Sequence, residues 1–425
     1  MIEPAPAARA RVSGVSQILG ATVIAGVAAY VVTWLVPHQI GLANYALFAV
    51  FWSFLYLVVG TLSGIQQEVT RGTRVRSGPR SRRVARASGF AIAAASAVIV
   101  GVWATAPFWV GATFSHVGNH GGSHGGTLLV WPLAVGTASY VLVAVFCGSL
   151  YGTARWRALA VMIGGDALLR LLLIAVTLSF TTNVVALAWA TVIPFPLTLL
   201  IVGLWMRRSL VGNSQLDVGY RALSWNVART MLAAAATGAM VSGFPLLLGL
   251  TAATERPATV GLYILAITLT RAPLIVVAMS LQSYFVVAFK SPGATFWRNF
   301  LRLQALILGS GIVLALAGWW LAPAIFAFLF NGAQVQGWFI AVLVLSSALV
   351  GSLCISAPAV LARGQHFVYA AGWLVAAVIT IVALLLPLEF TARTLVALIV
   401  GPIAGLLIHG TYLARSVSTL SRNQA

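Results

Sequence analysis

Acidic residues are nearly absent from this sequence of 425 residues. Six Asp and Glu stand against 25 Lys and Arg, and charged residues make up only 7% of the chain, whereas about 25% is usual in a soluble domain. The longest polar stretches, residues 69–86, 114–126 and 207–222, are shorter than the roughly 40 residues that the smallest self-supporting domains need. With 60% hydrophobic residues, the composition excludes a cytosolic or secreted enzyme and indicates an integral membrane protein.

Other absences exclude further classes of protein. The two cysteines, Cys147 and Cys354, lie inside apolar segments, so no disulfide framework is predicted. No phosphate-binding Gly-Lys-Ser/Thr loop and no nucleophile with its base can be assembled, so we expect neither an enzyme nor a cofactor. The net charge of +19 is concentrated in loops on one side, and there is no basic and aromatic surface on which nucleic acid could lie, so nucleic acid is not a predicted partner.

Twelve apolar stretches, each near the roughly 20 residues of a membrane-spanning helix, fill almost the whole sequence. The first is longer than the 7 to 15 apolar residues of a signal peptide, so we expect it to be retained as a span. The twelve stretches are residues 13–36, 43–68, 86–113, 127–150, 158–180, 184–206, 223–250, 258–288, 300–330, 336–362, 367–387 and 392–415.

The basic residues predict the orientation of these spans. With the N-terminus in the cytoplasm, 20 of the 25 Lys and Arg lie on the cytoplasmic side, and only Arg256 and Arg393 lie outside. This distribution satisfies the positive-inside rule. We therefore expect a multi-pass protein of the plasma (inner) membrane with both termini in the cytoplasm.

The second half of the sequence repeats the first. Tyr45 and Tyr263 open corresponding spans 218 positions apart, and the Trp and Pro of residues 103–107 recur 216 positions later in residues 319–323. Because six spans separate the copies, the repeat is parallel, and we expect an all-α protein of two six-helix bundles related by a pseudo-two-fold axis. The predicted segments are a cytoplasmic tail (1–12), an N-terminal lobe (13–206), a linker (207–222), a C-terminal lobe (223–415) and a tail (416–425).

Three glycine pairs predict close helix contacts. They have the Gly-xxx-Gly spacing that lets membrane helices approach one another. The pairs are Gly60 and Gly64, Gly148 and Gly152, and Gly401 and Gly405.

Three arginines inside predicted spans are candidate substrate ligands. Arg271 lies near the middle of its span, where an arginine costs about 2.5 to 3.5 kcal/mol, so it must face protein or water. It would bind an anionic group, or it would be a structural residue bonded to carbonyls freed by Pro273. Arg229 lies about two turns into its span and can also extend toward the membrane surface. Arg170 is the third candidate.

Two acidic residues are candidates for pairing or ion coupling. Asp166 is four residues before Arg170, so the two share a helix face and can pair. Glu68 ends the second span, where it would bond to nearby arginines or act at a gate.

Histidines at 116, 120 and 124 recur at a spacing that suits a metal on a helix. The glycines around them favour a flexible loop instead, so no metal site is predicted.

Five segments resemble oligosaccharide flippases of actinobacteria, which belong to the multidrug/oligosaccharidyl-lipid/polysaccharide (MOP) exporter superfamily. The resemblance covers almost the whole chain. It implies a two-lobed transporter with alternating access that moves polyprenyl-linked sugars outward. Lipid II flippases of the same superfamily have two additional helices that this chain lacks. The segments are residues 47–53, 66–71, 166–170, 269–274 and 361–364.

We therefore expect a flippase that moves an anionic polyprenyl-phosphate-linked saccharide, or a related envelope glycolipid, from the inner to the outer leaflet. The excess of arginine over aspartate within the spans agrees with an anionic ligand. Expected partners are this lipid-linked substrate, membrane lipids, and envelope glycosyltransferases or polymerases. A multidrug antiporter of the same fold and a non-transporting scaffold for polysaccharide synthesis are the alternatives.

Overall fold

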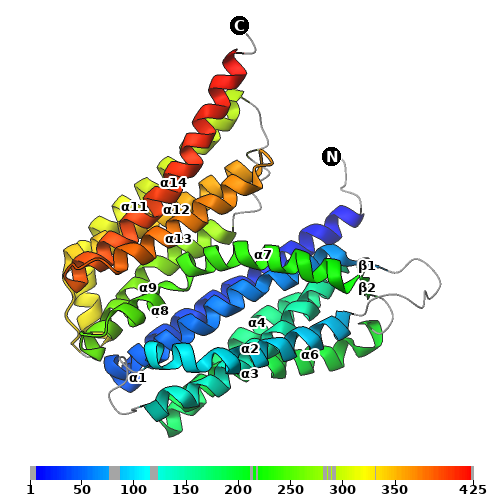
Figure 1. The fold of residues 1–425 in the computed structure, drawn as a ribbon, viewed down its shortest axis with the longest axis horizontal. Coiled ribbons are helices and arrows are strands. Elements are labelled where there is room, and N and C mark those ends of the chain that lie inside the picture. Colours follow the sequence, from blue (N-terminus) through cyan, green and yellow to red (C-terminus); the bar gives the residue numbers. More distant parts are fainter. Residues whose placement is uncertain are drawn as a thin grey trace. The chain divides into compact units, whose positions relative to one another are not determined.

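The computed structural model describes residues 6–75, 87–114, 123–210, 214–216, 219–280, 285, 289, 293–330 and 332–422. Within these residues the chain is almost entirely helical, as Figure 1 shows. The helices are α1 (Pro6–Gly72), α2 (Ala87–Phe114), α3 (Ser123–Gly152), α4 (Trp156–Phe180), α5 (Val184–Val192), α6 (Pro194–Leu210), α7 (Tyr220–Val241), α8 (Phe244–Thr251), α9 (Pro257–Ser280), α11 (Gly293–Leu329), α12 (Gly337–Leu361), α13 (His366–Leu384) and α14 (Phe390–Arg422).

The helices account for the twelve predicted spans. Nine helices of the described residues are long and apolar enough to cross a membrane. One of these, α1, has an apolar part of 57 residues, about 85 Å at 1.5 Å per residue, which is enough for two spans. The bent pair of α7 and α8 and the shorter apolar helix Pro257–Arg271 in α9 supply the other two. The chain is a multi-pass membrane protein.

The first two spans form one interrupted helix instead of two helices joined by a loop. Within α1 the helical backbone breaks at Gly41, which has a φ of 75°. Glycine adopts this left-handed conformation without the steric cost that a side chain would add. A single residue therefore suffices to separate the spans predicted at 13–36 and 43–68.

The chain divides into two compact units, Met1–Gly238 (unit 1) and Ala239–Ala425 (unit 2). The division falls inside α7, so most of this helix packs with unit 1. A short part of the predicted linker, Ser214–Leu216, forms strand β2, which pairs antiparallel with β1 (Thr73–Val75). The linker is thus tied to the end of α1, although the boundary between the sequence repeats at 207–222 stays a prediction.

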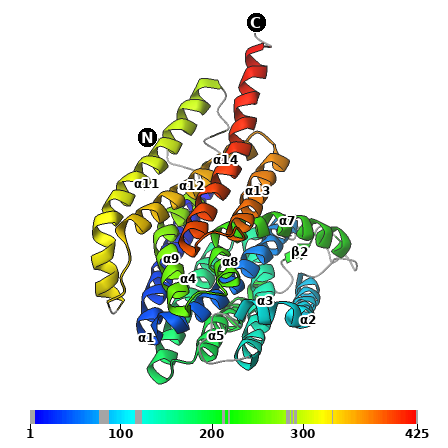
Figure 2. The ribbon, with the colours of Figure 1, turned by 60° about the vertical axis from the view of Figure 1, so that its left-hand side comes forward.

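Helix contacts within unit 1 recur within unit 2. In unit 1, α1 and α2 both pack on α3, and α4 packs on α5 and α6. In unit 2, α9 and α11 both pack on α12, and α13 packs on α14; Figure 2 shows α11, α12 and α14 side by side. The matching order of contacts is that of two equivalent six-helix bundles, as the sequence repeat predicts.

The repeated tryptophans occupy matching helix contacts. Trp103 in α2 packs edge-to-face on Trp131 of α3, with ring centroids 4.5 Å apart. Trp319 in α11 has Gly337 of α12 directly against its carbonyl oxygen. The repeat therefore marks equivalent helix pairs in the two units.

The predicted glycine pairs lie at close helix contacts. A Cβ added at Gly148 would lie 2.9 Å from a carbonyl oxygen of α1, and one at Gly64 would lie 2.9 Å from a backbone nitrogen of α7. A Cβ at Gly401 would lie 2.8 Å from a carbonyl oxygen of α13. These approaches are closer than a side chain permits, so the glycines fix the spacing of the helices that carry the polar residues described below.

Candidate functional site

Unit 1 holds a buried ion pair on α4. Arg170 Nη2 donates a hydrogen bond of 2.6 Å to Asp166 Oδ2, and Arg170 Nε donates one of 3.0 Å to the carbonyl oxygen of Thr191 in α5. This carbonyl lies three residues before Pro194, at the junction of α5 and α6. Arg170 is only 7% exposed, so its charge is neutralised inside the unit.

Aromatic rings enclose the Arg170 guanidinium. Its central carbon lies 4.9 Å from the ring centroid of Phe195 and 5.7 Å from that of Tyr56. Phe195 in turn packs edge-to-face on Tyr140 at 5.5 Å. Because cation–π contacts of a desolvated guanidinium are attractive, three further helices, α1, α3 and α6, hold Arg170 in place.

One carboxylate oxygen of Asp166 takes no part in the ion pair with Arg170. Its Oδ1 is buried and accepts no hydrogen bond, and the side chain is 20% exposed against 9% for Arg170. This oxygen has the chemistry to accept a proton, a cation or a hydrogen-bond donor of a ligand.

Arg271 is the buried cation of unit 2. It lies in α9, is 4% exposed, and donates from Nη2 to the carbonyl oxygen of Met240 at 3.0 Å. Its guanidinium lies 5.5 Å from the ring centroid of Phe244. From the sequence, the structural partners expected for Arg271 were carbonyls freed by Pro273. The carbonyl that Arg271 contacts belongs instead to the last turn of α7.

The break between α7 and α8 explains this contact. The two helices are bent by 68°, and α8 begins at Phe244, followed by Pro245. Because the helix stops, the last carbonyls of α7 have no donor from a following turn. A cation at a helix C-terminus is also favoured by the helix dipole, so Arg271 stabilises the end of α7.

Arg271 differs from Arg170 in its charge balance. Among the described residues the ion pairs are Arg170 with Asp166 and Arg71 with Glu68, and none involves Arg271. Its Nε is buried and has no hydrogen-bond acceptor. Arg271 therefore retains both an uncompensated positive charge and an unused donor.

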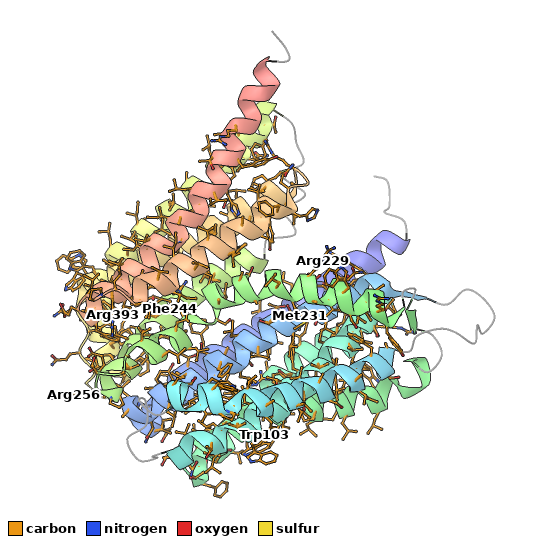
Figure 3. All side chains as sticks on the ribbon, in the orientation of Figure 1. Trp103, Arg229, Met231, Phe244, Arg256 and Arg393 are labelled. Atoms are coloured by element: carbon orange, nitrogen blue, oxygen red, sulfur yellow. The ribbon has the colours of Figure 1, made fainter. Side chains whose placement is uncertain are left out.

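Arg393 makes the same kind of contact at the end of α8. Its Nη2 donates to the carbonyl oxygen of Thr251 at 2.7 Å, and its guanidinium lies 5.4 Å from the ring centroid of Phe390. Figure 3 labels Arg393, Phe244 and Arg256 in this part of unit 2. Unlike Arg271, Arg393 is half-buried, and it lies in the first turn of α14 instead of the middle of a span.

Arg229 lies on the exposed face of α7 (Figure 3). Its guanidinium is 5.0 Å from the ring centroid of Trp225, one turn earlier on the same helix. Its position agrees with the expectation that this side chain can extend toward the membrane surface. Arg229 is therefore more accessible than the other two arginines.

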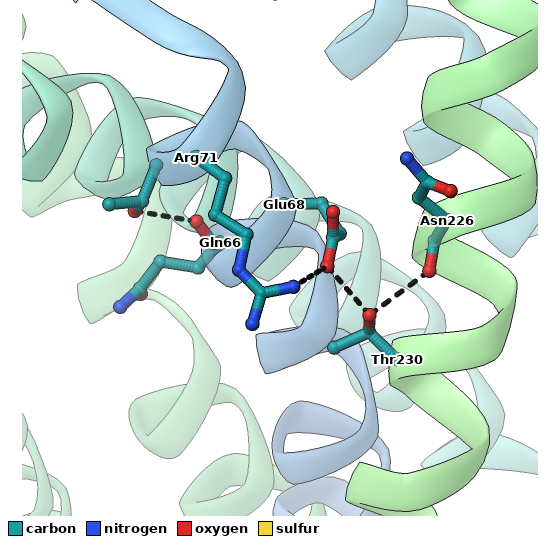
Figure 4. A network of polar contacts seen from close by, with 6 residues as sticks. Gln66, Glu68, Arg71, Asn226 and Thr230 are labelled. Atoms are coloured by element: carbon teal, nitrogen blue, oxygen red, sulfur yellow. Dashed lines mark hydrogen bonds and ion pairs between the residues drawn. The ribbon is translucent and has the colours of Figure 1, made fainter. Parts of the chain in front are cut away.

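Glu68 ties α1 to α7 within unit 1 (Figure 4). Its Oε1 accepts a hydrogen bond of 2.9 Å from Arg71 and one of 2.8 Å from the hydroxyl of Thr230, which also contacts the carbonyl oxygen of Asn226 at 3.0 Å. Glu68 is 7% exposed. The arginine contact was anticipated from the sequence, but the bond to α7, 162 positions away, was not.

A buried histidine in unit 2 is absent from the sequence-based candidates. His409 in α14 is fully buried, with Nδ1 2.9 Å from the hydroxyl of Ser356 in α12 and Nε2 3.4 Å from the carbonyl oxygen of Tyr369 in α13. The available signal was its position as the one histidine within the predicted span 392–415.

The histidines at 116 and 120 lie outside the described residues, so the predicted absence of a metal site in this loop stays a prediction. Within the part of the chain that is described, no group of three or more His, Cys, Asp and Glu is placed to hold a metal ion.

Relatives of known sequence cover nearly the whole chain. No protein-family model matches it. The uncharacterized protein Rv3630 of Mycobacterium tuberculosis is 30% identical over 409 residues, which are 95% of this chain and 92% of that protein. The uncharacterized protein Rv1510 of the same organism is 30% identical over 414 residues, 94% and 91% of the two chains.

This chain belongs to the family of these mycobacterial proteins. The solved structures to which this chain is similar include transporters. An inward-facing multidrug resistance MATE family transporter of the MOP superfamily aligns with a TM-score of 0.67 at 13% identity, over 93% of this chain and 96% of the transporter. The eukaryotic MATE transporter AtDTX14 aligns with a TM-score of 0.57 at 12% identity, over 95% of each chain.

The chain thus has the fold of these MATE transporters. This finding confirms the all-α architecture of two six-helix bundles.

Proposed function

We propose that this protein is an alternating-access flippase or exporter for an anionic polyprenyl-phosphate-linked saccharide or a related cell-envelope glycolipid. The exporter fold supports the general activity. The observation that carries the choice of substrate is Arg271, a buried cation with an unused N–H donor and no carboxylate partner among the described residues. An anion of the substrate would supply both the missing charge and the missing acceptor.

Phosphate suits this donor chemically. A guanidinium presents its N–H donors in a planar fork, so a phosphate can accept two hydrogen bonds at once. Nε and a neighbouring Nη of Arg271 would serve as such a pair. The bond to Met240 at the end of α7 would hold the guanidinium in orientation while the substrate binds.

The other two arginines have different roles in this proposal. Arg229, on the exposed face of α7, would attract the head group from the membrane surface. Arg170 is already neutralised by Asp166, so it would contact the saccharide or orient Asp166 instead of supplying net charge. Asp166 and Glu68 remain candidates for ion coupling, and their observed bonds make each a pairing residue.

The proposal also includes the orientation of the protein in the membrane and its partner enzymes. The charge distribution of the sequence supports a plasma-membrane protein with both termini in the cytoplasm. Substrate would enter from the cytoplasmic leaflet, where envelope glycosyltransferases assemble lipid-linked saccharides, and polymerases would receive it outside.

Two observations favour a second candidate, a multidrug antiporter. The similar solved structures include multidrug resistance transporters, and the buried, unbonded Oδ1 of Asp166 would attract an organic cation. The two candidates differ in the charge of the ligand.

Binding to the purified protein separates them. We expect a polyprenyl diphosphate to bind more tightly than tetraphenylphosphonium, and Arg271→Ala to weaken diphosphate binding by at least tenfold. Arg393→Ala is the matched control, because Arg393 also bonds a helix-terminal carbonyl and stacks on a ring. Equal losses in both variants would assign Arg271 a structural role, and preferential phosphonium binding that depends on Asp166 would favour the antiporter.

A further inference from the structure

A polar cluster in unit 2, separate from Arg271, surrounds His409. The imidazole is fully buried where α12, α13 and α14 meet. Gly372 of α13 lies so close that a Cβ there would overlap the ring at Nε2. The sequence therefore leaves space for this side chain where any larger residue in α13 would displace it.

The bonds of the neutral ring can be assigned from its neighbours. The carbonyl oxygen of Tyr369 only accepts hydrogen bonds, so the contact of 3.4 Å with Nε2 requires the proton on Nε2. Nδ1 then has a lone pair, and the hydroxyl of Ser356 donates to it over 2.9 Å. Both ring nitrogens are bonded in this state.

The same cluster also accommodates a second proton. The Ser356 hydroxyl lies 3.1 Å from the carbonyl oxygen of Leu353. If a proton binds to the lone pair of Nδ1, the Ser356 hydroxyl turns its own proton to Leu353 and accepts from Nδ1–H. No covalent bond breaks, and every N–H and O–H of the cluster still has an acceptor.

No fixed charge in the cluster decides between the two states. From α12 the facing group is the Ser356 hydroxyl, and from α13 it is the Tyr369 carbonyl beside Gly372. The phenols of Tyr369 and Tyr412 pack in the adjoining apolar cluster, and Arg363 lies two residues after the end of α12. The exposed cations of this part of the unit are Arg298, Arg302 and Arg415.

The one carboxylate among the described residues 337–422 lies far from the ring. The described carboxylates of unit 2 are Glu255 and Glu389. Glu389 precedes α14 by one residue, which places it about 30 Å along the helix axis from His409. A bound proton would thus add an uncompensated charge beneath three packed helices, so its occupancy would depend on how closely those helices pack.

We propose that His409 is a reversible proton-binding site through which the packing of α12, α13 and α14 responds to protonation, and that this proton is coupled to transport. The coupling rests on the proposed transport function, whereas proton binding to His409 does not. Ser356 is the positioning residue, because its hydroxyl serves as donor in one state and as acceptor in the other.

Proton binding is tested on the purified full-length protein by NMR of nitrogen-labelled histidine. The resonance missing from His409→Gln identifies His409, and we expect its chemical shift to titrate within the pH range over which the protein stays folded. In Ser356→Ala the midpoint should fall by about one pH unit, since a hydrogen bond to the charged ring is roughly twice as strong as one to the neutral ring. A His409 resonance that does not titrate in this range would overturn the proposal.

Coupling is tested in vesicles with an imposed pH gradient and a fluorescent polyprenyl-diphosphate saccharide. His409→Gln should lose the response to the gradient, whereas the control His366→Gln, at an exposed histidine that begins α13, should keep it. A full response in His409→Gln would overturn the coupling role. If the wild-type protein moves no saccharide, the proposed function fails, and the NMR titration still decides proton binding.

Discussion

Breaking the ion pair of α4 should destabilise the protein more than breaking the pair of Glu68 with Arg71, whose cation is exposed. Asp166→Asn removes the charge that faces Arg170, which is 7% exposed. Removing one partner of a buried pair costs about 3 to 5 kcal/mol. Because the Asp166 side chain is 20% exposed, solvent screens part of the remaining charge, and we expect about 2 to 3 kcal/mol.

The expected loss is measurable as a melting shift in detergent. For a unit of this size, 2 to 3 kcal/mol corresponds to a decrease of about 5 to 10 °C. The matched control is Arg71→Ala, which breaks the pair with Glu68. Arg71 is 73% exposed, and after its removal Glu68 keeps the hydrogen bond from the Thr230 hydroxyl, so the melting temperature of Arg71→Ala should fall by less than that of Asp166→Asn.

A double variant tests the cause. Asp166→Leu combined with Arg170→Met removes both charges and should recover most of the stability, because the isolated buried charge is what destabilises the single variant. The reasoning is refuted if Asp166→Asn melts within about 1 °C of the wild-type protein, or if the double variant is less stable than Asp166→Asn.

Three further predictions concern topology and packing. A cysteine at Ala253 should react with an impermeant thiol reagent in intact cells and one at Ala154 should not, because they lie on opposite sides of the predicted membrane; the reverse labelling would invert the orientation. Gly148→Val should prevent close packing of α3 on α1 and lower the melting temperature, whereas Gly20→Ala, with nothing within 4 Å of the added Cβ, should not lower it. Thr230→Val should cost about 1 to 3 kcal/mol by removing a donor to a buried carboxylate; an unchanged melting temperature would assign the bond between α1 and α7 no role in stability.

Local sequence spacing predicted the parts of the site that lie on one helix. Asp166 and Arg170 are four residues apart, so helical geometry alone places them on one face. The same holds for Arg71 and Glu68, three residues apart. The spans themselves follow from apolar length, because the bilayer fixes how long a crossing helix must be.

Local sequence spacing could not predict the contacts between different helices. The bond of Arg271 to Met240 depends on a 68° bend between α7 and α8, whose direction no single residue specifies. Thr230 meets Glu68 because α7 packs with unit 1, although α7 begins the second sequence repeat. His409 was visible as a polar residue in an apolar span, but its partners Ser356 and Tyr369 come from two other helices.

The most direct test of the central claim is flipping of a fluorescent polyprenyl-diphosphate saccharide by the purified protein in vesicles. An added reductant quenches only the label in the outer leaflet, so protected label reports the inner leaflet. We expect the wild-type protein and Arg393→Ala to move the lipid, and Arg271→Lys to retain part of the rate because it keeps the charge without the planar fork. We expect Arg271→Ala to be inactive although it folds, with a melting temperature that falls no further than that of Arg393→Ala. Normal flipping by Arg271→Ala would contradict the account.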